Sequence, residues 1–184
     1  MYIMEQKTIL KDSIWRVFEI FVDEPMKIHY IKEISRKINL APTSVKNHLE
    51  RLEIENLIIK DKGEIFSGFR SNRDNYNFIF YKKISNITKI KESGLLDYLI
   101  DLMYPKVIVL YGSYLRGEDT EKSDIDIFII SKSRKRLETD KFERILKRKI
   151  HIIIDKNLSS FKEELKSEIV NGFILYGYLD IKNG

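Results

Sequence analysis

Two carboxylates spaced by one residue, Asp124 and Asp126, are the strongest candidates for chemistry in this chain. On a β-strand, residues two apart point to the same face, so the two carboxylates would lie side by side and repel each other. A divalent cation between them removes this repulsion, and Mg²⁺ or Mn²⁺ prefers oxygen ligands of this kind. The alternative is a solvated, acidic start of a strand. The pattern predicts a metal site formed by Asp124 and Asp126.

A Gly-Ser pair stands shortly before these aspartates. Val107–Tyr111 is a short apolar run typical of a buried strand, and Gly112-Ser113 interrupts it. Glycine lets the backbone approach a phosphate closely, and the N–H groups and serine hydroxyl at a helix start can donate hydrogen bonds to phosphate oxygens. Gly112 and Ser113 are therefore candidates for binding a phosphorylated ligand beside the predicted metal.

The combination of strand, Gly-Ser, spacer, Asp-x-Asp and second apolar strand resembles the minimal nucleotidyltransferases of the DNA polymerase beta superfamily. The resemblance covers roughly the second half of the chain. It implies an α+β fold with a mixed sheet and flanking helices. It also implies that an NTP, ATP in the first place, binds at Gly112 and Ser113 with Mg²⁺ on the aspartate pair. Arg116 and Ser123, which lie in the spacer, are further nucleotide-binding candidates.

One position departs from the family pattern. The family has a third carboxylate in the strand after Asp-x-Asp, where it helps to hold a second metal and accepts the proton of the attacking hydroxyl. That position holds His151 here, whose imidazole can accept a proton but is a poor Mg²⁺ ligand. Asp155 follows four residues later, roughly 13 Å away at normal strand rise, which is too far to replace it. His151 is either the catalytic base or a polar residue at a strand end.

Two functions are consistent with these residues. The first is an enzyme that transfers a nucleoside monophosphate from an NTP to an acceptor. In its small size the chain resembles minimal nucleotidyltransferases that act as antitoxins by modifying a partner HEPN toxin protein. The resemblance makes a HEPN toxin protein a candidate acceptor. The second is a transcriptional regulator whose nucleotidyltransferase domain only senses a nucleotide, and His151 favours this alternative.

The first part of the chain predicts a separate domain. Apolar residues recur at helical spacing in residues 10–22, around Ile34 and after Pro42, and a hairpin pattern follows at residues 57–67. Helix, helix-turn-helix and hairpin in this order resemble a winged-helix domain over residues 8–72. The polar face of the third helix predicts contacts with double-stranded DNA by Thr43, Ser44, Lys46, Asn47 and Arg51. The alternative is a module that only docks proteins.

The remaining organisation follows from spacing and charge. Residues 73–94 are predicted to form a linker helix with Phe80 on its apolar stripe, and residues 95–184 the nucleotidyltransferase domain. A segment at residues 132–149 holds nine basic and three acidic residues, which indicates a solvated helix face or a surface for an anion. Winged helices usually pair on DNA half-sites, so a homodimer is expected.

Bulk composition excludes several classes of protein. The 184 residues are 43% hydrophobic, which indicates a globular chain large enough for one or two cores. There is no cysteine, so disulfides, thiolate metal sites and cysteine nucleophiles are excluded. No apolar run reaches the length of a membrane span and no signal-peptide pattern opens the chain, which predicts a cytoplasmic location without membrane contact. The net charge of +5 is too small to predict nucleic-acid binding by itself.

Overall fold

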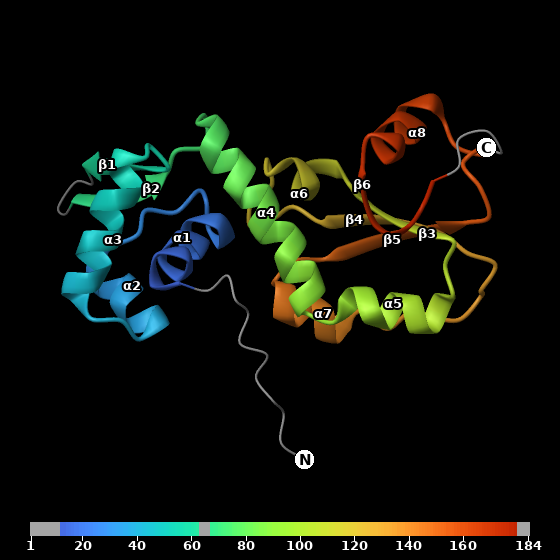
Figure 1. Ribbon diagram of the computed structural model, residues 1–184, viewed down its shortest axis with the longest axis horizontal. Helices are drawn as coiled ribbons and strands as arrows, with labels where there is room; N and C mark the ends of the chain where they lie inside the picture. Colours follow the sequence, from blue (N-terminus) through green and yellow to red (C-terminus); the bar gives the residue numbers. More distant parts are fainter. Residues whose placement is uncertain (1–11, 63–66, 180–184) are drawn as a thin grey trace, which may run out of the picture. The chain divides into compact units, whose positions relative to one another are not determined.

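The structure is a computed structural model that describes residues 12–62 and 67–179. The chain divides into two compact units, residues 1–82 and 83–184. The division falls within the long helix α4 (Tyr76–Glu92), which occupies most of the predicted linker (Figure 1). Phe78 of this helix packs in the core of the first unit and Ile90 in the core of the second. The predicted apolar stripe of α4 is wrong at Phe80, which is 47% exposed.

Besides the start of α4, three helices and a two-stranded sheet make up the described part of the first unit. They are α1 (Ser13–Asp23), α2 (Ile31–Ile38), α3 (Pro42–Ile54), β1 (Ile58–Lys62) and β2 (Ser67–Ser71). The helices lie where helical periodicity predicts them, because one apolar stripe on each is buried in a common core. Phe21 of α1, Ile34 of α2, and Val45 and Leu49 of α3 are fully buried there.

The turn between α2 and α3 follows from local residue chemistry. Asn39 ends α2 with φ 50, in the left-handed region that asparagine tolerates better than most residues. Pro42 occupies the first turn of α3, where its missing N–H has no intrahelical partner to lose. The predicted short turn between these two helices is therefore present at Asn39 to Pro42.

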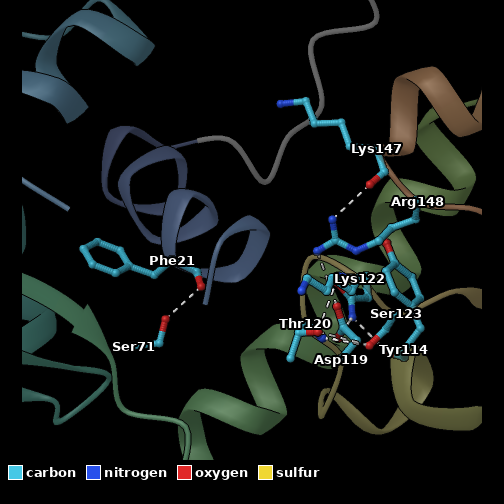
Figure 2. A network of polar contacts seen from close by, with 10 residues as sticks. Phe21, Ser71, Tyr114, Asp119, Thr120, Lys122, Ser123, Lys147 and Arg148 are labelled. Atoms are coloured by element: carbon cyan, nitrogen blue, oxygen red, sulfur yellow. Dashed lines mark hydrogen bonds and ion pairs between the residues drawn. The ribbon is translucent and has the colours of Figure 1, made fainter. Parts of the chain in front are cut away.

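The hairpin lies later in the chain than predicted. Its predicted second strand began at residue 64, and residues 63–66 lie outside the described residues. The strand observed is Ser67–Ser71, which pairs antiparallel with β1. Most residues of this strand have low β-propensity, so the sequence pattern does not predict it. Its place is set by tertiary contacts instead, because Phe69 exchanges backbone hydrogen bonds with His29. The side-chain hydroxyl of Ser71 also donates a hydrogen bond to the Phe21 carbonyl (Figure 2).

The second unit is a mixed four-stranded sheet with helices on both faces. After α4 the elements are α5 (Leu95–Met103), β3 (Val107–Tyr111), α6 (Gly112–Arg116), β4 (Ile125–Ile130), α7 (Asp140–Leu146), β5 (Ile150–Asp155), α8 (Glu163–Val170) and β6 (Phe173–Gly177). The strand order is β5-β4-β3-β6. β3 runs antiparallel to β4 and β6, whereas β4 and β5 are parallel. The predicted mixed sheet with flanking helices is confirmed.

Alternate side chains of the central strands β3 and β4 pack into two hydrophobic cores, one on each face of the sheet. Ile108 and Leu110 pack with residues of α5 and α7 on one face. Val107 and Val109 pack with Ile169 of α8 on the other face, and α8 lies on the opposite side of the sheet from α5 and α7 in Figure 1. Strands covered on both faces are continuously apolar, which explains why the sequence signals them so clearly.

Two local sequence patterns in this unit form structures other than those they indicate. The spacing of Ser160 and Glu163 is typical of a capping box, but α8 begins at Glu163 without a side-chain cap. The Ser160 hydroxyl donates to Asp155 instead. The basic segment is helical only over α7, and eight residues before it have no regular structure. Most of its charged side chains are exposed, consistent with solvation.

None of the helices in the described ranges is both long enough and apolar enough to cross a membrane.

Candidate functional site

Asp126 lies at the centre of the candidate site, on β4 between two neighbouring strands. The strand register places it opposite Tyr111, the last residue of β3, and opposite His151 of β5. His151 Nδ1 is 3.3 Å from Asp126 Oδ1, so the two side chains form an ion pair or hydrogen bond. Asp155 pairs with Ile130 at the opposite end of the same ladder, which rules out a register change that would bring it to Asp126.

Gly112 makes the closest backbone approach to Asp126. Its φ of +77° lies in the left-handed region that favours glycine. A Cβ at this position would lie 2.5 Å from Asp126 Oδ2, closer than nonbonded atoms approach, and 3.3 Å from Asp126 Cγ, which is a tight contact. The Gly112 backbone therefore adjoins the carboxylate, and a side chain there would force the carboxylate to move.

Asp124 was predicted to lie in the strand beside Asp126, but β4 begins at Ile125. The physical reason is that β3 ends opposite Asp126 and turns into α6, so no strand pairs with residue 124 on that side. Asp124 is exposed in the preceding loop. It lines a cleft of about 650 Å³ together with Ser123 and five basic residues, which are Lys122, Arg144, Lys147, Arg148 and Lys149. Four acidic residues, Asp124 included, share this lining: Glu121, Asp124, Asp140 and Glu143.

The electrostatics of the site disfavour an ionised Asp126. Burial raises the pKa of the Asp126 carboxyl, the hydrogen bond and charge of His151 oppose this, and the charges of Asp124 and Glu168 add to the increase. Burial also raises the pKa of Tyr111 to about 12, with Asp126 and Glu168 acting in the same direction. A bound cation would reverse the cost of ionising Asp126, because it stabilises the negative carboxylate.

Glu168 on α8 is a carboxylate that sequence analysis missed. Its Oε2 is 2.7 Å from Arg116 Nη1, and Arg116 Nε is 2.8 Å from Glu118 Oε2. The Glu118 hydrogen bond is the main cause that raises the pKa of Arg116. Arg116 is thus paired with two carboxylates and would have to leave one of them to contact a triphosphate. No spacing signal links Glu168 to this site, since α8 reaches it only through folding.

A buried polar network holds the loop that leads to Asp124 (Figure 2). Asn86 of α4 donates from Nδ2 to the Tyr114 carbonyl at 2.8 Å and to Asp119 Oδ1 at 2.9 Å. Arg148 Nη2 is 3.7 Å from Asp119 Oδ2, and both side chains are buried. Such charge-assisted contacts in a buried setting position the loop firmly.

The two predicted serines differ in their surroundings. Ser123 is part of a turn, in which its hydroxyl accepts a hydrogen bond from the Thr120 N–H at 3.0 Å (Figure 2). Its oxygen is thus engaged in the loop. Ser113 is half-buried in the first turn of α6, and its hydroxyl makes no hydrogen bond to another residue within the described part of the chain. Ser113 is the better placed of the two to bind a ligand.

The candidate DNA-binding residues lie on α3 of the first unit. Thr43, Lys46, Asn47 and Arg51 are exposed and Ser44 is half-buried. Lys46 forms an exposed i,i+4 ion pair of 3.8 Å with Glu50, which is weak. His48 of the same helix is half-buried, and its Nε2 is 2.8 Å from the Ser13 hydroxyl.

A divalent cation of the Mg²⁺ type fits the donor atoms at the candidate site. The carboxylate of Asp126 is half-buried, its Oδ2 faces a glycine without a side chain, and the charge of Asp124 is near enough to act on its pKa. Hard oxygen ligands of this kind suit Mg²⁺. Asp126 and Asp124 would hold the ion, while His151 offers nitrogen, which Mg²⁺ disfavours.

Comparison with known proteins supports a nucleotidyltransferase domain in the second unit. Residues 92–176 match the family model described as "Nucleotidyltransferase domain", which spans α5 to β6 and includes the whole candidate site. No curated protein and no solved structure matches the chain. Such domains transfer nucleoside monophosphates and generally use NTP and divalent metals.

Proposed function

We propose that the protein is a nucleotidyltransferase that binds an NTP with Mg²⁺ at Asp126 and Asp124 and transfers the nucleoside monophosphate to an acceptor. The observation that carries the proposal is the convergence of Gly112, Asp126 and His151 within a domain that matches the nucleotidyltransferase family. ATP is the first nucleotide to test.

The reaction requires one bond to form and one to break. The oxygen of an acceptor hydroxyl bonds to the α-phosphorus, the bond from this phosphorus to the oxygen that bridges to the β-phosphate breaks, and pyrophosphate leaves. A Mg²⁺ ion held by Asp126 and Asp124 would supply positive charge that neutralises the charge developing on the phosphates. The protein's residues hold the triphosphate near Gly112 and Ser113 and accept the hydroxyl proton.

His151 is the proposed proton acceptor. With a cation bound, Asp126 is ionised and can only accept a hydrogen bond. Nδ1 of His151 then carries the hydrogen at 3.3 Å and Nε2 keeps its lone pair. The His151 side chain is 59% exposed, so an acceptor hydroxyl can reach it. Asp126 thereby orients the base in addition to binding the metal.

Replacing His151 tests this role. We expect His151→Ala to reduce transfer by about 10²- to 10⁴-fold, the usual contribution of a general base, with Mg-NTP affinity unchanged. His151→Asp restores the carboxylate of the family pattern and should keep or raise activity. Labelled ATP incubated with cell extract provides the assay, and the labelled species identifies the acceptor, for which a HEPN-type partner protein is one proposal. Transfer that survives His151→Ala unchanged would remove His151 from the mechanism.

The second candidate function is a regulator that senses the nucleotide without turning it over. The register supports it, because the residue opposite Asp126 on β5 is a histidine where the family has a carboxylate. In that case the wild-type protein binds Mg-NTP but transfers nothing, and His151→Asp creates transfer activity. The same assay therefore separates the two functions.

We also propose that the first unit is a winged helix that binds double-stranded DNA through α3, as a dimer on paired half-sites. Lys46 and Arg51 would contact phosphates and Asn47 a base edge. We expect Lys46→Gln to weaken binding to all sequences and to lower the salt slope by about one. Asn47→Ala should relax the preferred sequence, which selection from random duplexes followed by mobility shifts can measure.

The matched control for Lys46→Gln is Lys91→Gln, which removes the same charge from an exposed pair with Asp97 outside the first unit. It should leave DNA binding unchanged. Selection that enriches no sequence, or equal losses in both variants, would leave protein docking as the role of this unit.

A further inference from the structure

Three side chains in the first unit converge away from the nucleotidyltransferase domain. One ligand atom each from Glu24, His29 and Glu33 lies within 4.8 Å of the others. Among the described residues this is the sole group of three His, Cys, Asp or Glu side chains that converges so closely. The candidate site around Asp126 does not form such a group, so the two sites are chemically different.

His29 is oriented as a metal ligand. Its side chain is fully buried, and its Nε2 is 3.1 Å from the Glu24 carbonyl oxygen. A carbonyl only accepts hydrogen bonds, so Nε2 carries the hydrogen and Nδ1 keeps a lone pair. Nδ1 is buried without a hydrogen-bond partner. Buried nitrogen atoms are normally hydrogen-bonded, so this one needs an explanation.

Nδ1 lies near both carboxylates, with one ligand atom of each residue within 4.8 Å of the others. Glu33 Oε1 is 3.8 Å from it, too long for a hydrogen bond but close to the spacing of two ligands in a tetrahedral site with metal–ligand bonds of about 2.0–2.2 Å. A backbone carbonyl on the other ring nitrogen is the usual outer partner of a metal-bound histidine. These distances leave room for an ion between His29 and the two glutamates.

The backbone holds the three ligands in place before any ion binds. Glu24 is the residue at the C-terminal end of α1, and Glu33 lies in the first turn of α2. His29 exchanges backbone hydrogen bonds with Phe69 of β2, at 2.8 and 2.9 Å, and its ring packs edge-on against Phe21. A preorganised set of ligands loses little conformational freedom on binding.

We propose that Glu24, His29 and Glu33 bind a transition-metal dication of the Zn²⁺ type. One imidazole and two carboxylates are suitable ligands for such ions, whereas Mg²⁺ prefers oxygen alone. The fourth position of the coordination shell is left for water or another small ligand. The ion would join the end of α1, the His29 segment and the first turn of α2, so it would stabilise the first unit.

Two lysine side chains form ion pairs with the carboxylates of Glu24 and Glu33. Lys27 Nζ is 2.6 Å from Glu33 Oε1 and 3.9 Å from Glu24 Oε2, and Lys37 Nζ is 2.5 Å from Glu24 Oε2. Both lysine side chains are partly exposed and can turn into solvent. The ion therefore competes with these ammonium groups, and removing Lys27 should strengthen metal binding.

The test is Co²⁺ binding to the full-length chain carrying Asp124→Asn and Asp126→Asn, which removes the carboxylates of the other candidate metal site. We expect one Co²⁺ per chain, with the visible absorption of a four-coordinate ion, displaced by Zn²⁺. Adding Glu33→Gln should weaken Co²⁺ binding by more than about 100-fold, since even outer-shell changes cost 10- to 100-fold. Lys27→Met should strengthen it by roughly two- to fivefold, the factor of an exposed ion pair.

The matched controls come from the same unit. Glu53 has the same side-chain exposure as Glu33, 31%, and pairs with Lys60 at 3.1 Å. Glu53→Gln and Lys60→Met should leave Co²⁺ affinity unchanged. Zn²⁺ should also raise the Tm of the background protein but not that of the Glu33→Gln variant. The proposal is overturned if no Co²⁺ binds to the background protein, or if Glu33→Gln binds Co²⁺ as tightly as Glu53→Gln.

Discussion

Replacing Asp126 by asparagine should abolish metal-dependent NTP binding and lower any transfer by about 10³-fold, the scale of losing a central electrostatic stabiliser. Asparagine keeps the shape of the side chain but removes the charge that holds the cation. Asp126 lies between β3 and β5 and adjoins Gly112, so no other carboxylate can take its place through a small movement. Calorimetry with Mg-ATP measures the binding, and Asp124→Asn should show a smaller loss.

The same substitution should leave the Tm unchanged or raise it. Burial raises the pKa of Asp126 in the folded state, which means that ionising this group costs stability at pH values above its ordinary pKa. Asparagine removes that cost. A protein that gains stability as it loses ligand binding would show that Asp126 is retained for function.

Asp155→Asn is the control for this experiment. Asp155 lies on β5 opposite Ile130, at the far end of the β4–β5 ladder, and its carboxylate accepts hydrogen bonds from Lys156 N–H and the Ser160 hydroxyl. Its replacement should not change Mg-ATP affinity. If both variants bind Mg-ATP as the wild type does, the assignment of the site to Asp126 is wrong.

Replacing Gly112 by alanine should weaken Mg-NTP binding by about 10²-fold, the effect of displacing a ligand-binding group by about 1 Å. The added Cβ would lie 2.5 Å from Asp126 Oδ2, so the half-buried carboxylate must move. Alanine with φ +77° also costs about 1–2 kcal/mol of stability, because the left-handed region is strained for residues with a side chain.

Gly94→Ala separates these two effects. Gly94 has the same φ of +77°, but a Cβ there meets nothing within 4 Å. It should therefore lose a similar amount of stability in thermal unfolding and keep full Mg-NTP affinity. Equal affinity of the Gly112→Ala and Gly94→Ala variants would contradict the placement of the ligand at the Gly112–Asp126 contact.

The sequence alone determined the order of the elements and the core of the candidate site. Helices and strands were predictable because burial imposes a period on neighbouring residues, as in the stripe of Val45, Leu49 and Leu52 on α3 or the apolar run of β3. Gly-Ser and Asp-x-Asp are local patterns as well, so Gly112 and Asp126 were found before folding was considered. Strand β2 was misplaced because its residues carry little local preference.

The tertiary structure alone decided most of the groups that surround Asp126. Strand register pairs Asp126 with His151, as the family pattern implied. However, α8 brings Glu168 near it, and Asp124 falls outside the strand because β3 has already turned into α6. The cluster around His29 is also invisible in the sequence. These contacts depend on pairing and packing between segments far apart in the chain, for which spacing along the sequence carries no signal, so folding must place them.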